Sequence, residues 1–165
     1  MVAGSNPVGP ILKKMKPKLL YHGSVRKISG DKFIPRQGKD LADAPENVHK
    51  AIYATYVKEI AIAMAIVRCK GVKSSSLDFN NKPYGRIYVG WPKQKYVYLY
   101  ILPSDTFKQL GGGGRQWISY EPVKPTEVKK LAISDYVYLV RKATKKEIEG
   151  WLKKYGDRLR KRRKK

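Results

Sequence analysis

The alternation of apolar and polar residues predicts most of the strands of this chain. In the segment 95–103, Tyr96, Tyr98 and Tyr100 alternate with Val97, Leu99 and Ile101. A period of two is typical of a strand with one face turned inward. By the same pattern and by flanking turn residues, further strands are expected at 19–22, 51–55, 85–91, 116–123, 128–134 and 136–142.

Helical periodicity appears in two places. Residues 60–67 form an unbroken apolar run directly after the strand 51–55, which predicts a buried helix that Thr55 can cap. Near the C-terminus, Thr144 and Glu147 have the spacing of a capping box. One face of the helix that follows would carry Ile148, Trp151, Leu152, Tyr155 and Leu159, which predicts a helix docked on the domain.

The order of these elements predicts one α+β domain dominated by strands. Residues 1–18 lack periodicity and are expected to form a flexible basic arm, 19–142 the folded domain, and 143–165 the amphipathic helix with a basic tail. The polar stretch 23–50 is too long for a turn, and loops of such length often cover a site. The glycine run 111–114 lacks the Gly-Lys-Ser/Thr of a phosphate loop and is expected to be a hairpin loop.

The net charge of the chain is the main evidence about its binding partner. The chain has 36 Lys and Arg against 13 Asp and Glu, a formal net charge of +23. Because cations that meet phosphates release condensed counterions, this excess favours nucleic acid, RNA or DNA, as a partner over an anionic membrane surface. The candidate nucleic-acid-binding residues form the C-terminal tail: Arg158, Arg160, Lys161, Arg162, Arg163, Lys164 and Lys165.

Other classes of protein are disfavoured. A single cysteine, Cys69, excludes an internal disulfide and a zinc site with several thiolates, so no metal is predicted. Cys69 is expected to be a small buried hydrophobe, and His49 a surface residue. The longest apolar run falls well short of the roughly 20 residues of a membrane helix, which predicts a cytoplasmic protein. The tyrosines at 96, 98, 100, 136 and 138 are expected on covered strands rather than as platforms for bases.

Three separated segments carry candidate chemistry. They are "YHGS" at 21–24, "AIYAT" at 51–55 before the apolar helix, and "WISYEPV" at 117–123. In this order they resemble the His-Tyr-Glu arrangement of the ADP-ribosyltransferase superfamily, in the branch that includes the poly(ADP-ribose) polymerases. The resemblance covers about 19–140 and implies a split β-sheet core flanked by helices that uses NAD as co-substrate for glycosyl transfer.

The resemblance also implies roles for individual residues. His22 would donate a hydrogen bond to a ribose hydroxyl of NAD, and Gly23 and Ser24 would hold the nicotinamide amide by their backbone. Tyr53 would stack on the nicotinamide ring. Glu121 would bond the ribose and stabilise the positive charge that grows as nicotinamide leaves, with Glu127 as the reserve carboxylate. His22, Tyr53 and Glu121 are therefore the candidate catalytic residues, acting on a target that is nucleic acid or is bound to it.

This sequence departs from the pattern in two places. Met64 stands where a second aromatic residue often completes the nicotinamide site, and Ser119 stands where arginine-modifying toxins carry Gln or Glu. Two alternatives remain open: a noncatalytic RNA- or DNA-binding protein, and the same fold without activity.

Overall fold

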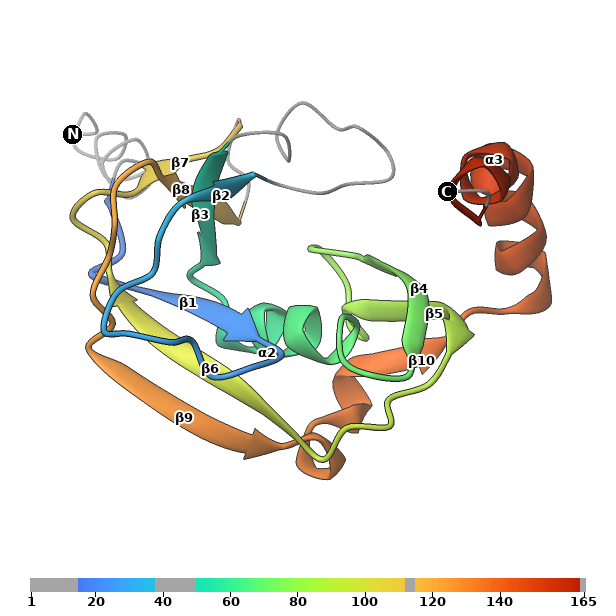
Figure 1. Cartoon of the computed structure of the whole chain (residues 1–165), viewed down its shortest axis with the longest axis horizontal. Coiled ribbons are helices and arrows are strands. Elements are labelled where there is room, and N and C mark those ends of the chain that lie inside the picture. Colours follow the sequence, from blue (N-terminus) through green and yellow to red (C-terminus); the bar gives the residue numbers. More distant parts are fainter. Residues whose placement is uncertain (1–14, 38–49, 112–114, 164–165) are drawn as a thin grey trace, which may run out of the picture.

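The computed structural model describes residues 15–37, 50–111 and 115–163, with side chains described up to Gly156. It has two β-sheets and, among the described residues, two α-helices (Figure 1). Within these ranges the strand pairs are antiparallel except one, β10 with β5. The predicted α+β class is therefore confirmed.

The larger sheet has the order β7-β8-β3-β1-β6-β9, and β2 adds to β3. Its strands are β1 (Leu19–Ser24), β2 (Arg36–Gln37), β3 (Lys50–Thr55), β6 (Tyr96–Pro103), β7 (Lys108–Gln109), β8 (Gln116–Ser119) and β9 (Glu127–Ala132). The smaller sheet has the order β10-β5-β4, formed by β4 (Val72–Leu77), β5 (Gly85–Gly90) and β10 (Val140–Lys142).

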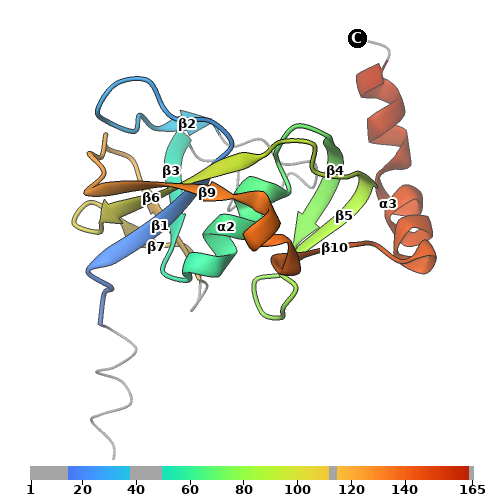
Figure 2. The ribbon, with the colours of Figure 1, turned by 90° about the horizontal axis from the view of Figure 1, so that it is seen from below.

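Helix α2 (Lys58–Ile66) lies between the two sheets, as Figures 1 and 2 show from two directions. It packs on β1 and β6 of the larger sheet and on β5 of the smaller one. Because the helix is covered on several sides, its apolar residues are not confined to one stripe, and six of its nine residues are buried. The apolar run therefore encodes a central helix rather than an amphipathic one.

The face of the larger sheet opposite α2 has a core of its own. Phe33, Val123 and Trp117 cover it there, and Phe33 and Val123 form an isolated antiparallel bridge. From β6, Tyr100 and Leu102 point into this second core, whereas Val97 and Leu99 point toward α2. Both faces of the central strands are thus buried, which explains why tyrosines alternate with aliphatic residues there.

Gly23 allows α2 to lie directly on β1. A Cβ at this position would be 1.8 Å from the carbonyl oxygen of Ala61 and 3.1 Å from the Cβ of Ala65. No side chain fits within that distance of backbone. The small residues on α2 and the glycine on β1 therefore set the distance between the helix and the sheet.

Two expectations about local structure are wrong. Residues 136–139 are not a strand: Tyr136 follows the 3-10 turn Ile133–Asp135, and Tyr138 lies in a second, Val137–Leu139, before β10. Thr55 does not cap α2, which has Val57 as its N-cap without a side-chain bond, although the Thr55 hydroxyl accepts a hydrogen bond from the Val57 N–H at 3.1 Å. A further strand, β4, was not predicted, because its serines, which pair with β5, give no apolar alternation.

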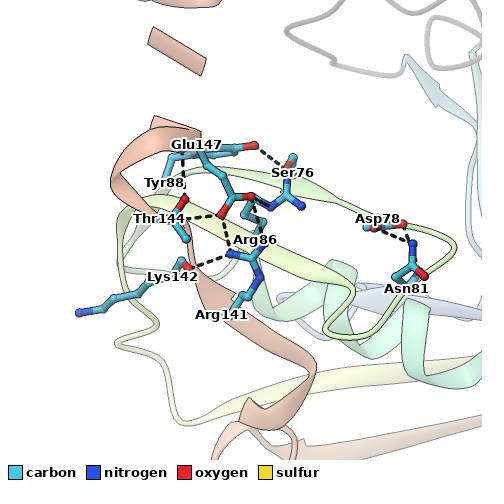
Figure 3. Close-up of polar contacts among 9 residues, drawn as sticks. All are labelled: Ser76, Asp78, Asn81, Arg86, Tyr88, Arg141, Lys142, Thr144 and Glu147. Carbon is cyan, nitrogen blue, oxygen red and sulfur yellow. Dashed lines mark hydrogen bonds and ion pairs between the residues drawn. The ribbon is translucent and has the colours of Figure 1, made fainter. Parts of the chain in front are cut away.

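Helix α3 (Lys145–Arg163) begins with the predicted capping box. The Thr144 N–H donates to Glu147 Oε1 at 3.0 Å, and the Glu147 N–H donates to Thr144 Oγ1 at 3.2 Å. The Glu147 carboxylate also receives both terminal nitrogens of Arg141, at 2.8 and 3.0 Å, and lies 2.7 Å from Arg86 Nε (Figure 3). One carboxylate thus joins α3 to two strands of the smaller sheet.

Packing of α3 rests on Trp151, which is buried and stacks on Tyr88 of β5 at a centroid distance of 5.0 Å. Leu152 was expected on the same apolar face, but half of its surface is exposed. Leu159 and the candidate nucleic-acid-binding residues from Arg158 onward have no described side chains. Within the described residues, α2 is too short and α3 too polar to cross a bilayer.

We expect Gly23→Ala to destabilise the domain strongly, because the added methyl group cannot be accommodated against the Ala61 carbonyl. Overpacking of this kind costs typically about 1–3 kcal/mol, measured as a drop in the urea midpoint. Gly150→Ala is the matched control: a Cβ there meets nothing within 4 Å, and alanine favours a helix. If the two variants were equally stable, α2 would not lie as close to β1 as the structure shows.

Docking of α3 should depend on pH through Glu147. The hydrogen bonds from Arg141, followed by the N–H of Thr144, lower the pKa of Glu147 from 4.5 to about 2. A carboxyl whose pKa is lowered on folding stabilises the docked helix above its ordinary pKa and loses that effect as pH falls toward 2. The hydrogen-exchange protection factors of α3, which compare the measured rates with the rates of an unfolded chain at the same pH, should therefore fall below pH 4.5, and Glu147→Gln should lower them already at neutral pH. Slow exchange in the variant would contradict this role.

Candidate functional site

The candidate site lies where β1 and β3 separate. β1 pairs with β6 along its whole length, from Leu19 to Ser24, but with β3 only at Tyr21, opposite Thr55. Beyond this pair the two strands diverge, as their different directions in Figure 1 show. The predicted "YHGS" segment begins at this point, and its histidine is the next residue.

His22 links β1 to β3 at the point where the two strands separate. Its Nδ1 lies 2.6 Å from the carbonyl oxygen of Tyr53 on β3. On the other side, its ring meets Phe33 edge to face at a centroid distance of 4.8 Å. The ring is thus fixed by one hydrogen bond and one aromatic contact.

The protonation state of His22 follows from this geometry. A carbonyl oxygen can only accept, so Nδ1 carries the proton of that hydrogen bond. Burial, together with the positive charges of Arg68 and Arg36, lowers the pKa of His22 below its ordinary value of 6.5, although the bond to Tyr53 opposes the shift. The ring is therefore neutral at pH 7, and its Nε2 is an acceptor. The donor role that the resemblance implied does not fit this tautomer.

Tyr53 meets His22 through its main chain. Ile52 and Ala54 point into the core that contains Phe33, and successive residues of a strand point to opposite faces. The Tyr53 side chain therefore belongs to the α2 face, and its surface is half-buried. The structure brings the predicted His and Tyr together as ring and carbonyl rather than as two facing rings.

Gly23 has a structural explanation of its own. The space that its missing Cβ leaves is occupied by the Ala61 carbonyl of α2. Close packing of the helix, not the approach of a ligand, is what this glycine visibly permits. Ser24, the last residue of the motif, donates a hydrogen bond from its hydroxyl to the carbonyl of Arg26 at 2.6 Å and so turns the chain at the end of β1.

Glu121 is exposed on the loop after β8. Its main chain is held by Ser119, which is fully buried: the Ser119 hydroxyl donates to the Glu121 carbonyl at 3.0 Å and accepts from the Glu121 N–H at 3.2 Å. Within the described residues, the Glu121 carboxylate forms neither a hydrogen bond nor an ion pair with His22 or Tyr53. The sequence position that departs from the toxin pattern, Ser119, thus anchors the loop that carries Glu121.

Glu127 lies farther from the histidine. It begins β9, which β6 separates from β1, and its carboxylate is 3.9 Å from Lys129.

Three further residues were singled out in the sequence. Cys69 is buried, and burial raises the pKa of its thiol. Met64 is half-buried against the core around α2. His49 lies outside the described residues.

Sequence reasoning missed Phe33, Arg36 and Arg68 as neighbours of His22. They come from the long polar stretch and from the residues after α2, where no motif marks them. The only signal was a lone aromatic residue, Phe33, within a polar segment. Comparison with protein-family models, with curated proteins and with solved structures gives no match for this chain.

The His22 ring should titrate below pH 6.5 and carry its proton on Nδ1 when neutral. The measurement is a ¹⁵N NMR titration, with His49→Gln to leave a single histidine. Because the folded-state pKa is lowered, the contribution of His22 to stability is complete above pH 6.5 and is lost as pH falls below it. A pKa above 6.5, or a proton on Nε2, would contradict the bond to Tyr53.

Proposed function

We propose that this protein is an NAD-dependent ADP-ribosyltransferase. The observation that carries the proposal is the bond from His22 to the Tyr53 carbonyl at the point where β1 and β3 separate. It leaves a neutral imidazole with one acceptor nitrogen between the two strands that bear the predicted motifs.

The residues around His22 suit a dinucleotide. Its Nε2 can accept a hydrogen bond from a ribose hydroxyl, and Arg36 and Arg68, which act electrostatically on the ring, are cations of the kind that bind a pyrophosphate. In the proposed complex NAD supplies the ADP-ribosyl group, with nicotinamide as the leaving group. His22, held by the Tyr53 carbonyl, orients the ribose, and the backbone of Gly23 and Ser24 lies beside the nicotinamide amide.

Glu121 is the proposed electrostatic group. Its loop is anchored by Ser119, while its carboxylate is exposed and engaged by no cation among the described residues. A carboxylate that is not already neutralised can stabilise positive charge on a bound sugar. Such a group acts mainly in the transition state, so its removal should lower the rate more than the affinity.

We expect Glu121→Gln to lower the release of nicotinamide from NAD on the order of 10²-fold or more while NAD binding is retained, because the amide keeps the shape and loses the charge. Glu127→Gln is the matched control and should have the activity of the wild-type protein. The measurements are nicotinamide release by chromatography and NAD affinity by calorimetry, on the full-length protein.

Three results would overturn parts of this proposal. Wild-type protein that neither binds nor cleaves NAD would remove the enzymatic function altogether. Full activity of Glu121→Gln would remove that residue from the mechanism, and loss in Glu127→Gln alone would transfer the role to Glu127. The alternative of a noncatalytic nucleic-acid-binding protein is favoured by a different feature, the cationic surface beyond the end of β1.

A further inference from the structure

Two adjoining hollows lie beyond the C-terminal end of β1. Their volumes are about 330 and 650 Å³. Both are lined by Val25, Arg26 and Gln94, so they lie on either side of a shared wall. We call the pair the β1-end groove.

The described walls of the β1-end groove carry only positive charge. The smaller hollow is lined by the cations Arg26, Lys27, Lys95 and Lys130, and the larger one adds Arg68 and Lys70. Neither lining includes an aspartate or a glutamate.

Gln94 makes the wall shared by the two hollows rigid. Its Nε2 donates to the carbonyl oxygens of Val25 and Tyr96, both at 2.7 Å, and its Oε1 accepts from the Lys70 N–H at 3.2 Å. One amide thereby joins the end of β1, the turn after α2 and the start of β6. The backbone positions from which the cations of these three segments project are therefore held together, which lowers the entropic cost of binding a ligand.

Tyr96 positions two of the cations. The Lys130 ammonium lies 4.3 Å and the Lys95 ammonium 5.4 Å from the centre of its ring. Because the lysines occupy the ring, it is not a free platform for a nucleic-acid base. The groove is therefore suited to contact phosphates and not to read bases.

We propose that the β1-end groove binds the phosphodiester backbone of a single nucleic-acid strand, without sequence preference. A concave wall of cations fits a threadlike polyanion, whereas a flat bilayer surface would not reach the floor of a hollow. This site lies on the folded domain, apart from the basic tail, and it does not depend on the proposed NAD chemistry.

The smaller hollow and His22 share one face of the larger sheet. Along β1, His22 is opposite Tyr100 and Ser24 is opposite Tyr98, a residue that lines the smaller hollow. Arg26 follows His22 by four residues, at most about 13 Å at 3.3 Å per residue. A strand bound in the groove would therefore lie within reach of His22.

The test is a triple variant, Arg26→Gln with Lys95→Gln and Lys130→Gln, against the matched control Lys32→Gln with Lys58→Gln and Lys124→Gln. The control changes three exposed lysines outside the groove and has the same net charge. The probes are fluorescent single-stranded oligonucleotides, one oligo(dT) and one of mixed sequence, titrated by anisotropy at several salt concentrations.

We expect the groove variant to lower the log-log salt slope by roughly 2 units, since each phosphate contact on a single strand contributes about 0.7. The control should lose less than half as much, and both oligonucleotides should bind equally. A variant that keeps the charge, Lys95→Arg with Lys130→Arg, should bind as the wild-type protein does. This result separates an effect of lost charge from an effect of lost folding.

Equal losses in the groove variant and the control would overturn the proposal, because the charge would then act without a defined site. It is also overturned if deletion of Arg160 to Lys165 alone removes all salt-dependent binding. Stronger groove-dependent binding to phosphatidylserine vesicles or to poly-glutamate than to oligonucleotides would replace nucleic acid by a membrane or an acidic protein. Failure of NAD binding, by contrast, leaves this inference intact.

Discussion

The contact of α2 with β1 at Gly23 is the constraint on which the rest of the structure depends. Because the Ala61 carbonyl occupies the space of a side chain, β1 must face α2 with its glycine and so turns His22 to the opposite face. There the histidine meets Phe33 and the second core. The same helix covers β6 and β5, so one close approach fixes both sheets and the orientation of the candidate site.

Electrostatics divides the molecule into two regions. Three acidic side chains around the smaller sheet have structural roles: Glu147 of α3 holds two arginines, Glu59 of α2 pairs with Lys82 at 2.7 Å, and Asp78, directly after β4, accepts from the Asn80 N–H at 2.8 Å. The described lining of the β1-end groove has no carboxylate. Ion pairs neutralise cations where the smaller sheet and its helices pack together. The fold therefore concentrates excess positive charge at the β1-end groove.

Several features could be predicted from sequence because their causes are local. The apolar run after β3, the alternation in β6 and the capping box of Thr144 and Glu147 depend on neighbours a few residues away. The strand β4 and the turns at Tyr136 and Tyr138 could not, because tertiary pairing overrides weak propensity there. The bond from His22 to the Tyr53 carbonyl and the proximity of Arg36 and Arg68 are nonlocal, and no residue pattern encodes them. Motif reasoning therefore singled out His22 and Tyr53 but did not predict that the ring of one donates to the carbonyl of the other.

Arg68 links the two proposals physically. It lines the larger hollow and, with Arg36, contributes to lowering the pKa of His22. An anion held by Arg68 would offset this positive charge and so raise the affinity of the ring for a proton. By thermodynamic reciprocity, protonation of His22 would in turn strengthen the binding of that anion. We therefore expect a polyanion bound at Arg68 in the β1-end groove to raise the pKa of His22, whichever chemistry the site performs.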